Sequence, residues 1–173
     1  MFALSDKKVL VTGASGGIGG AIARAMHAQG ATVALAGRKR EVLDALAADL
    51  GDRCHVIVGD LGDTASADAM LSAASDAMDG IDVLVNNAGL TRDNLAMRLK
   101  DEDWQDVIDV NLTATFRLSR AVLRGMMKAR WGRIINVTSI VGVTGNAGQA
   151  NYAASKAGIV GMSKAMAAEV ATR

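Results

Sequence analysis

The sequence predicts an α/β fold in which a doubly wound parallel sheet carries helices on both faces. Short runs rich in Val and Ile alternate with longer helical patterns, which is typical of repeated βαβ units with right-handed crossovers. Half of the residues are hydrophobic but only 3% are aromatic, so the core has to be aliphatic, as in a buried parallel sheet. The length of 173 residues suits a single domain, residues 1–173.

Five strands are expected, each a short β-branched run bounded by polar or Gly-containing turns. They are residues 8–12, 32–36, 55–59, 82–86 and 133–138. After the first strand, Ile18, Ile22 and Met26 recur at every fourth residue, so the apolar stripe of a helix should face the sheet. Further helices are expected over residues 41–50, 66–78 and 152–173, and residues 101–128 should form two consecutive helices or one long bent helix.

The end of the sequence is unusual for this architecture. A helix that follows a strand should return the chain to another parallel strand, yet Arg173 is the last residue. We therefore expect the domain to be truncated after the helix that follows the fifth strand. That strand would then be a bare edge of the sheet.

Charge and composition exclude several classes of partner. The 19 Lys and Arg residues balance 18 Asp and Glu residues, which argues against nucleic-acid binding. No apolar run approaches the span of a bilayer and the first residues do not read as a signal peptide, so we expect no membrane partner and a cytoplasmic location. No metal site is predicted, because His27 and His55 lack the spacing of a ligand pair.

A glycine-rich turn, TGASGGIG at residues 12–19, joins the first strand to the first helix. Glycines permit a tight turn and let backbone N–H groups approach a pyrophosphate at the positive end of the helix. A turn in this place is typical of the Rossmann-type dinucleotide-binding fold, although it could also be only a tight connection. The candidate cofactor-binding residues here are Gly13, Ser15, Gly17, Ile18 and Gly19.

The end of the second strand bears on the choice between NADPH and NADH. An NAD site of this kind usually offers an acid to the adenosine ribose, but residues 37–40 contain no carboxylate. The guanidinium of Arg38 can hold a 2′-phosphate through paired hydrogen bonds, so we predict NADPH. The alternative is that Arg38, Lys39 and Arg40 are a solvated charge run at the start of a helix.

Tyr152 and Lys156 lie four residues apart on the last predicted helix, so both should project from one face. A phenol ordinarily has a pKa of about 10, and a nearby ammonium favours its ionised form, which eases proton exchange near neutrality. Ser139 ends the fifth strand, where its hydroxyl could point into the cofactor cleft and donate to a substrate carbonyl. Singly, each residue has a structural alternative: Ser139 could end a strand, Tyr152 could cap the core and Lys156 could face solvent.

These motifs together resemble those of the short-chain dehydrogenase/reductase family. The shared features are the Gly-x-x-x-Gly-x-Gly turn, the segment NNAG at residues 86–89 and the Tyr-x-x-x-Lys pair. The resemblance implies that Asp60 and Leu61 bracket the adenine and that Asn87, Ala88 and Gly89 also contact the cofactor, although a strand end with Asn and Gly could merely turn. Members that prefer NADPH often have a second basic residue in the glycine loop, where this chain has Gly16.

The resemblance also implies a catalytic set and a mechanism. Hydride would pass from the nicotinamide to a keto carbon, and Tyr152 would protonate the developing alkoxide. Lys156 would hold the nicotinamide ribose as well, and Asn111 would support a water chain behind it. Ser139 would hold the substrate carbonyl.

Residues 86–95, 124–136 and 148–152 are most similar to the 3-oxoacyl-acyl-carrier-protein reductases within the family. This likeness implies reduction of a 3-oxoacyl group on acyl carrier protein to the (3R)-hydroxyacyl product in fatty acid biosynthesis. It also implies a homotetramer or homodimer packed through helices at 112–128 and 152–170, for which a solvent-exposed face is the alternative. Lys128, Arg130 and Arg173 are candidates for docking the acidic carrier protein.

Two other functions stay open at this point. The chain could be an acetoacetyl-CoA reductase or another short-chain alcohol or sugar dehydrogenase, which a comparison of substrates would distinguish. It could also be a dinucleotide-binding scaffold without turnover, which would bind NADPH but not oxidise it when a ketoacyl substrate is supplied.

Overall fold

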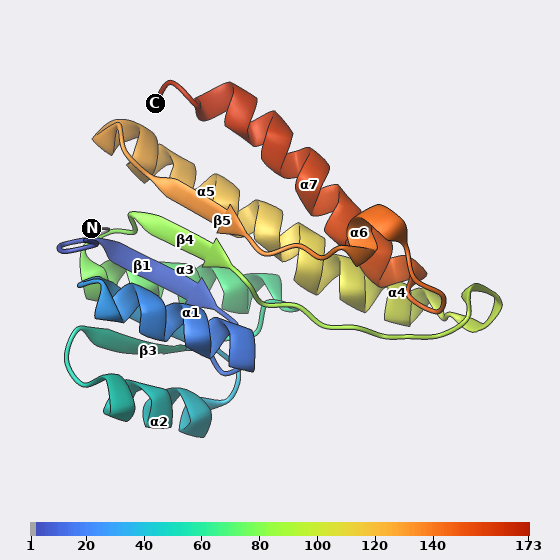
Figure 1. Ribbon diagram of the computed structural model, residues 1–173, viewed down its shortest axis with the longest axis horizontal. Coiled ribbons are helices and arrows are strands. Elements are labelled where there is room, and N and C mark those ends of the chain that lie inside the picture. Colours follow the sequence, from blue (N-terminus) through green and yellow to red (C-terminus); the bar gives the residue numbers. More distant parts are fainter. Residues whose placement is uncertain (1–2) are drawn as a thin grey trace.

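A computed structural model describes residues 3–173 and contains one five-stranded parallel sheet in the order β3-β2-β1-β4-β5 (Figure 1). The strands are β1 (Lys8–Thr12), β2 (Thr32–Gly37), β3 (Cys54–Val58), β4 (Val83–Asn86) and β5 (Arg133–Asn136). The predicted Rossmann-type fold class is confirmed, and all five strands lie where they were expected. The fifth is shorter than predicted, because the chain leaves the sheet after Asn136. Strand order reverses between β1 and β4, which is where ligands bind in folds of this kind.

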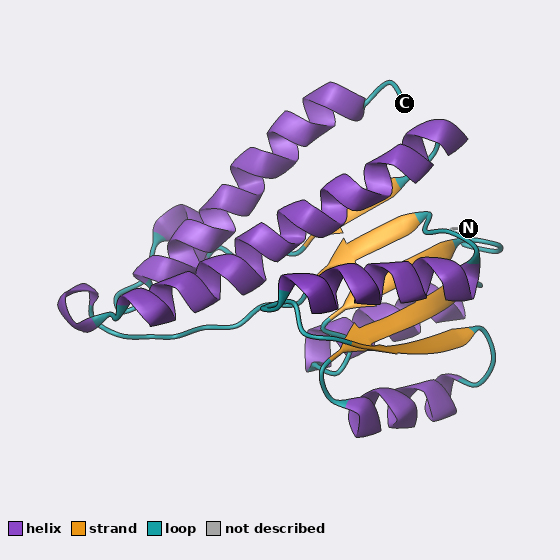
Figure 2. Cartoon of the chain, turned by 180° about the vertical axis from the view of Figure 1, so that it is seen from behind, coloured by secondary structure: helices purple, strands orange, loops and turns teal. Residues whose placement is uncertain are grey.

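Helices cover both faces of the sheet (Figures 1 and 2). The main ones are α1 (Gly17–Ala28), α2 (Arg40–Leu50), α3 (Thr64–Met78), α4 (Asp101–Ile108), α5 (Ala114–Ala129) and α7 (Ala150–Val170). Between α4 and α5 the π-helical turn η2 (Asp109–Thr113) keeps the helix continuous, so residues 101–129 form one long helix with an internal distortion. Two short elements were not predicted, η1 (Ala96–Arg98) and α6 (Val141–Thr144), because three or four residues are too few to show a periodic pattern.

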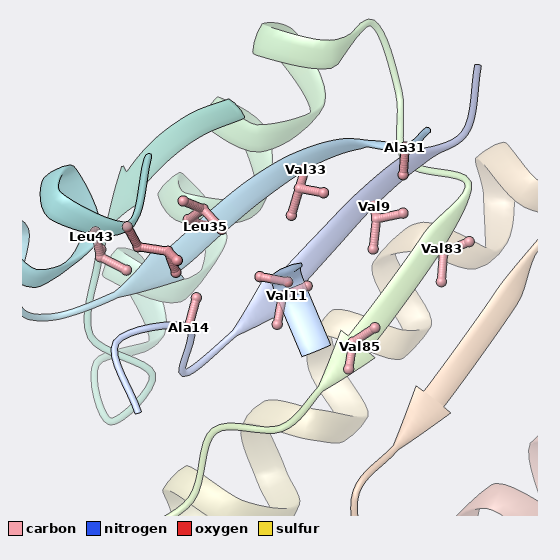
Figure 3. Packing of buried hydrophobic residues seen from close by; sticks show 11 residues of the cluster. Val9, Val11, Ala14, Ala31, Val33, Leu35, Leu43, Val83 and Val85 are labelled. Atoms are coloured by element: carbon pink, nitrogen blue, oxygen red, sulfur yellow. The ribbon is translucent and has the colours of Figure 1, made fainter. Parts of the chain in front are cut away.

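Alternate residues of the central strands feed two aliphatic cores, one on each face of the sheet. The first core lies under α1 and α2 and contains Val9, Val11, Ala23, Val33, Leu35, Leu43, Leu46, Val83 and Val85 (Figure 3). The second lies under α3 and α5 and contains Leu10, Ala34, Ala36, Met70, Ala74, Leu84, Leu118, Val122 and Met126. Both cores hold the same sheet, so the carboxyl ends of its strands form a rigid platform.

The predicted apolar stripe of α1 was wrong in one position. Ile22 and Met26 pack partly buried against the first core, but Ile18 is 67% exposed. The fully covered face of the helix consists of Gly19, Ala23 and His27 instead. The first turn of α1 lies so close to the end of β1 that only a glycine fits between them, so Ile18 is turned away from the sheet.

Strand β5 lies at one edge of the sheet and pairs with β4 alone among the described residues. Its Ile135 is 41% exposed, as expected of an uncovered edge. None of the helices within residues 3–173 combines the length and apolar character that a bilayer crossing requires.

Candidate functional site

A cavity of about 350 Å³ lies at the carboxyl ends of β1, β2, β3 and β4. It is lined by every predicted cofactor-binding residue that precedes Tyr152 in the chain. They are Gly13, Ser15, Gly17, Ile18, Gly19, Arg38, Asp60, Leu61, Asn87, Ala88 and Gly89. Segments that are far apart in sequence thus meet at one edge of the sheet, at the point where strand order reverses.

The glycine turn is built for close approach. Gly13 has a φ of +66°, and a Cβ there would lie 2.9 Å from the Cα of Ala88. A Cβ on Gly19 would lie 2.2 Å from the carbonyl oxygen of Gly13 and 2.6 Å from Asn87 Nδ2. Glycine is therefore required at both positions, whereas Gly17 faces open space.

The first turn of α1 is suited to an anion. Its N-cap is Gly16, which offers no side-chain cap, and the turn carries no acidic residue. Uncapped backbone N–H groups and the positive end of the helix favour a negatively charged ligand. The residues present therefore fit the pyrophosphate of a dinucleotide.

Two side chains hold the glycine turn against the end of β4. The hydroxyl of Thr12 accepts hydrogen bonds from the backbone N–H groups of Asn87 and Ala88, both at 3.1 Å. The amide of Asn87 donates to the carbonyl oxygens of Thr12 and Gly13 at 3.0 and 3.4 Å. Asn87 thus braces the wall of the cavity with its amide. Thr12 was not among the predicted site residues. Its hydroxyl at the end of a buried strand is the feature of the sequence that could have indicated it.

The side chain of Arg38 stands at the mouth of the cavity and is about two-thirds exposed, with Nη1 3.9 Å from Asp60 Oδ2. Residues 37–40 contain no carboxylate, as the sequence shows, but the fold brings the carboxylate of Asp60, which follows β3, beside Arg38. Solvent screens such an exposed pair strongly, so Arg38 stays available to a phosphate. Arg40 pairs with Asp44 along α2 instead, which agrees with a solvated role for that residue.

Tyr152 and Lys156 project from the first turns of α7. Lys156 is 4% exposed, its Nζ donates to the carbonyl of Val137 at 2.8 Å, and this nitrogen lies 5.7 Å from the centre of the Tyr152 ring. Burial lowers the pKa of Lys156 below its ordinary value. A Cβ on Gly89 would lie 3.7 Å from Lys156 Nζ, so the amine borders the cavity through Gly89. The solvent-facing alternative for Lys156 is therefore wrong.

Ser139 follows β5 and is half-buried, and its Oγ accepts a hydrogen bond from the N–H of Val141 at 3.2 Å. Accepting leaves the hydroxyl hydrogen free to be donated. The neighbouring Thr138 donates from Oγ1 to the carbonyl of Lys156 at 2.9 Å, which ties α7 to the end of β5. This bond holds the segment of Ser139 close to α7, although Ser139, Tyr152 and Lys156 do not line the cavity themselves.

Asn111 is fully buried in the π-helical turn. Its Oδ1 accepts from the N–H of Leu90 at 2.8 Å, and its Nδ2 donates to the carbonyl of Leu90 at 3.0 Å and to Ser155 Oγ at 3.1 Å. Ser155 in turn donates to the carbonyl of Tyr152 at 2.8 Å. The Asn111 side chain is therefore engaged in joining the loop after β4 to α7, a role that the sequence did not suggest. π-Helical turns often mark functional sites.

The three residues predicted to dock a carrier protein lie away from this cavity. Arg130 and Arg173 line a second groove of about 480 Å³ together with Trp131, near the start of β5. Lys128 lines a different groove, between α3 and α5. The structure thus brings two of the three candidates together.

Comparison with known proteins decides the family. A family model described as short chain dehydrogenase matches residues 7–173. The chain belongs to the short-chain dehydrogenase family. It is therefore an oxidoreductase that acts on CH–OH and C=O groups with a nicotinamide dinucleotide, and the cavity has the lining that such a cofactor needs.

Several curated proteins match the whole chain or nearly so. A nodulation protein G from Rhizobium sp. (strain N33) is 56% identical over 173 residues, which are 100% of this chain and 71% of that protein. A 3-oxoacyl-acyl-carrier-protein reductase from Vibrio cholerae is 54% identical over 170 residues, 98% of this chain and 70% of that protein. Another reductase of that name, from Rickettsia bellii, is 51% identical over 173 residues, 100% of this chain and 70% of that protein. The predicted likeness to these reductases is confirmed.

Residues 3–173 contain no group of three or more His, Cys, Asp or Glu side chains that could hold a metal ion. His27 is turned to a structural contact, with Nε2 2.8 Å from the carbonyl oxygen of Asp52.

Proposed function

We propose that the protein is an NADPH-dependent ketoreductase that converts 3-oxoacyl-acyl-carrier-protein to the (3R)-hydroxyacyl product in fatty acid biosynthesis. The observation that carries the proposal is the buried Lys156 amine, which lies beside both the Tyr152 ring and the glycine wall of the dinucleotide cavity. A phenol beside an amine that borders such a cavity supplies the acid-base pair that carbonyl reduction requires.

NADPH supplies the hydride when it is bound. Tyr152 donates a proton to the carbonyl oxygen as negative charge develops on it, and Ser139 donates a hydrogen bond to the same oxygen. The Lys156 ammonium stabilises the ionised phenol that remains. General acid catalysis of this kind contributes about 100- to 10,000-fold to a rate, and preorganised hydrogen bonds contribute more. Asn111 holds Leu90 and Ser155 in place behind this set.

Arg38 supports the choice of NADPH, because its guanidinium lines the cavity and is held there only by an exposed, solvent-screened pair with Asp60, which a 2′-phosphate can replace. The substrate class is supported by the names of relatives that are 51% and 54% identical. We propose Arg130, Arg173 and Lys128 as the residues that meet the acidic carrier protein, because they are exposed cations and two of them, Arg130 and Arg173, line one groove.

The long helix of residues 101–129 supports a homodimer or homotetramer. Residues 101–116 carry five acids and no Lys or Arg, whereas residues 117–127 carry three cations and no acid. Two copies packed antiparallel along this helix would pair the acidic half of each with the basic half of the other. Such self-complementarity is what a two-fold symmetric interface requires.

The test is an NADPH oxidation assay with acetoacetyl thioesters of acyl carrier protein and of CoA, run beside a titration of NADPH binding. Tyr152→Phe should bind NADPH as the wild type does and should lose turnover by at least about 100-fold. If Tyr152→Phe keeps its turnover, the assigned role is wrong. If the wild type binds NADPH but does not oxidise it when either thioester is supplied, the protein is not a ketoreductase of this class.

A further inference from the structure

Asn151, the residue that precedes Tyr152, is fully buried although its side chain is an amide. Its Nδ2 donates to the carbonyl of Arg92 at 2.9 Å and contacts the carbonyl of Asp103 at 3.3 Å. Its Oδ1 accepts from the N–H of Tyr152 at 2.8 Å. Both ends of the amide are therefore used, and they join three segments: the loop after β4, the first turn of α4, and α7.

The contact with Tyr152 replaces a helix cap. The first N–H groups of a helix have no partner within it, and a side chain at the N-cap usually supplies one. Gln149, at the N-cap of α7, makes no such bond. Asn151 supplies an acceptor to the N–H of Tyr152 from inside the helix, so the Tyr152 backbone is held at the junction with α4.

The junction has an exposed layer and a buried layer. In the exposed layer, Arg92 Nε lies 3.9 Å from Asp103 and 3.7 Å from Asp106. Such surface pairs contribute little, because water and salt screen them. In the buried layer, the Asn151 amide joins the carbonyls of Arg92 and Asp103 to α7.

Tyr152 and Lys156 are thus anchored to different parts of the molecule. Lys156 is tied to the end of β5, through the carbonyl of Val137 and the hydroxyl of Thr138. The N–H of Tyr152 is tied through Asn151 to α4 and the loop after β4. The distance between phenol and amine therefore depends on both anchors, not only on the helical spacing of the two residues.

We propose that Asn151 is a positioning residue for Tyr152, acting through the backbone to keep the phenol in register with Lys156 and the cavity. The proposal rests on the function proposed above. Small displacements of a reacting group, of about 1 Å, can lower a rate by about 100-fold. Asn151 touches neither substrate nor cofactor in this scheme, so its loss should lower kcat while NADPH binding is kept.

The test compares Asn151→Ala and Asn151→Ser with the wild type, and uses Asn146→Ala as a matched control. Asn146 is an exposed Asn in the loop between α6 and α7, and its Nδ2 donates to the Gln149 side chain. The quantity measured is kcat per NADPH-binding site, counted by titration, so any unfolded fraction drops out. The solvent deuterium isotope effect on kcat is measured as well, because a displaced proton donor slows proton transfer. Asn151→Ser keeps a small polar group, and the same criterion applies to it if Asn151→Ala does not fold.

We expect both Asn151 variants to lose about 10- to 100-fold in kcat per site, with the NADPH Kd within about twofold of the wild type and a larger isotope effect. Asn146→Ala should match the wild type. The positioning role is overturned if the Asn151 variants keep their kcat per site, or lose it with an unchanged isotope effect. Tyr152→Phe, run alongside, separates the two ideas. Retained turnover in that variant would remove the proposed function and the positioning role together, whereas lost turnover with active Asn151 variants would remove the positioning role alone.

Discussion

Replacing Gly19 with alanine adds one methyl group where the glycine turn is tightest. The new Cβ would lie 2.2 Å from the carbonyl oxygen of Gly13, whereas ordinary contacts begin near 3.4 Å. The partner is backbone and cannot rotate away, so the turn must open by more than about 1 Å. Overpacking of this kind costs about 1–3 kcal/mol, and the better helix propensity of alanine offsets up to about 1 kcal/mol.

Because the overlap is with rigid backbone, the upper part of that range applies, about 2–3 kcal/mol. After the offset from helix propensity, the expected net loss of stability is about 1–2 kcal/mol, which lowers the Tm of a domain of this size by roughly 2–8 °C. Because Gly13 and Asn87 move with the turn, the Kd for NADPH should rise by about tenfold or more, equivalent to about 1.4 kcal/mol. Both quantities can be measured, by thermal unfolding and by a fluorescence titration. Gly17→Ala is the matched control, since a Cβ there meets nothing within 4 Å, and its Tm should stay equal or rise slightly. A Gly19→Ala protein with wild-type Tm and wild-type NADPH affinity would refute this reasoning.

Three further outcomes are expected. Arg38→Ala should weaken NADPH binding by about 10- to 100-fold and leave NADH binding nearly unchanged. The control Arg40→Ala removes only a pair on the helix surface and should change the affinity for neither cofactor. Equal losses of NADPH and NADH affinity in Arg38→Ala would contradict the role of Arg38. Lys156→Met should be more stable than the wild type near pH 7, because burial lowers the folded-state pKa of this Lys and the unfolded chain then binds more protons. The difference between the two unfolding free energies, measured in urea, should shrink as the pH rises toward the ordinary Lys pKa of 10.5. A difference that grows with pH would contradict this prediction. Charge reversal of Arg130 and Arg173 together should raise KM for a carrier-protein thioester several-fold at low salt but not for the CoA thioester, and an unchanged carrier-protein KM would exclude this docking patch.

The sequence alone determined the fold class and most of the candidate site. The β-branched runs predicted all five strands because a parallel sheet buried on both faces needs continuous apolar segments. The spacing of Gly13, Gly17 and Gly19 predicted the turn, and a Cβ at Gly13 or Gly19 would block the close contact between strand and helix. The separation of Tyr152 and Lys156 placed both on one helical face. These are local properties, and local properties can be read from spacing.

Contacts between distant segments were decided by the tertiary structure alone. The sequence around Arg38 does not predict its pairing with Asp60. The sequence around Tyr152 does not predict that its neighbour Asn151 bonds to the carbonyls of Arg92 and Asp103. The apolar stripe predicted for α1 failed at Ile18 for a related reason: periodicity shows which residues share a face, but the distance between helix and strand decides which of them is covered. Side-chain amides such as those of Asn111 and Asn151 are polar in the sequence and become buried ties only when the chain brings them two or three partners. Hydrogen bonds of this kind depend on positions in space that no spacing along the chain encodes.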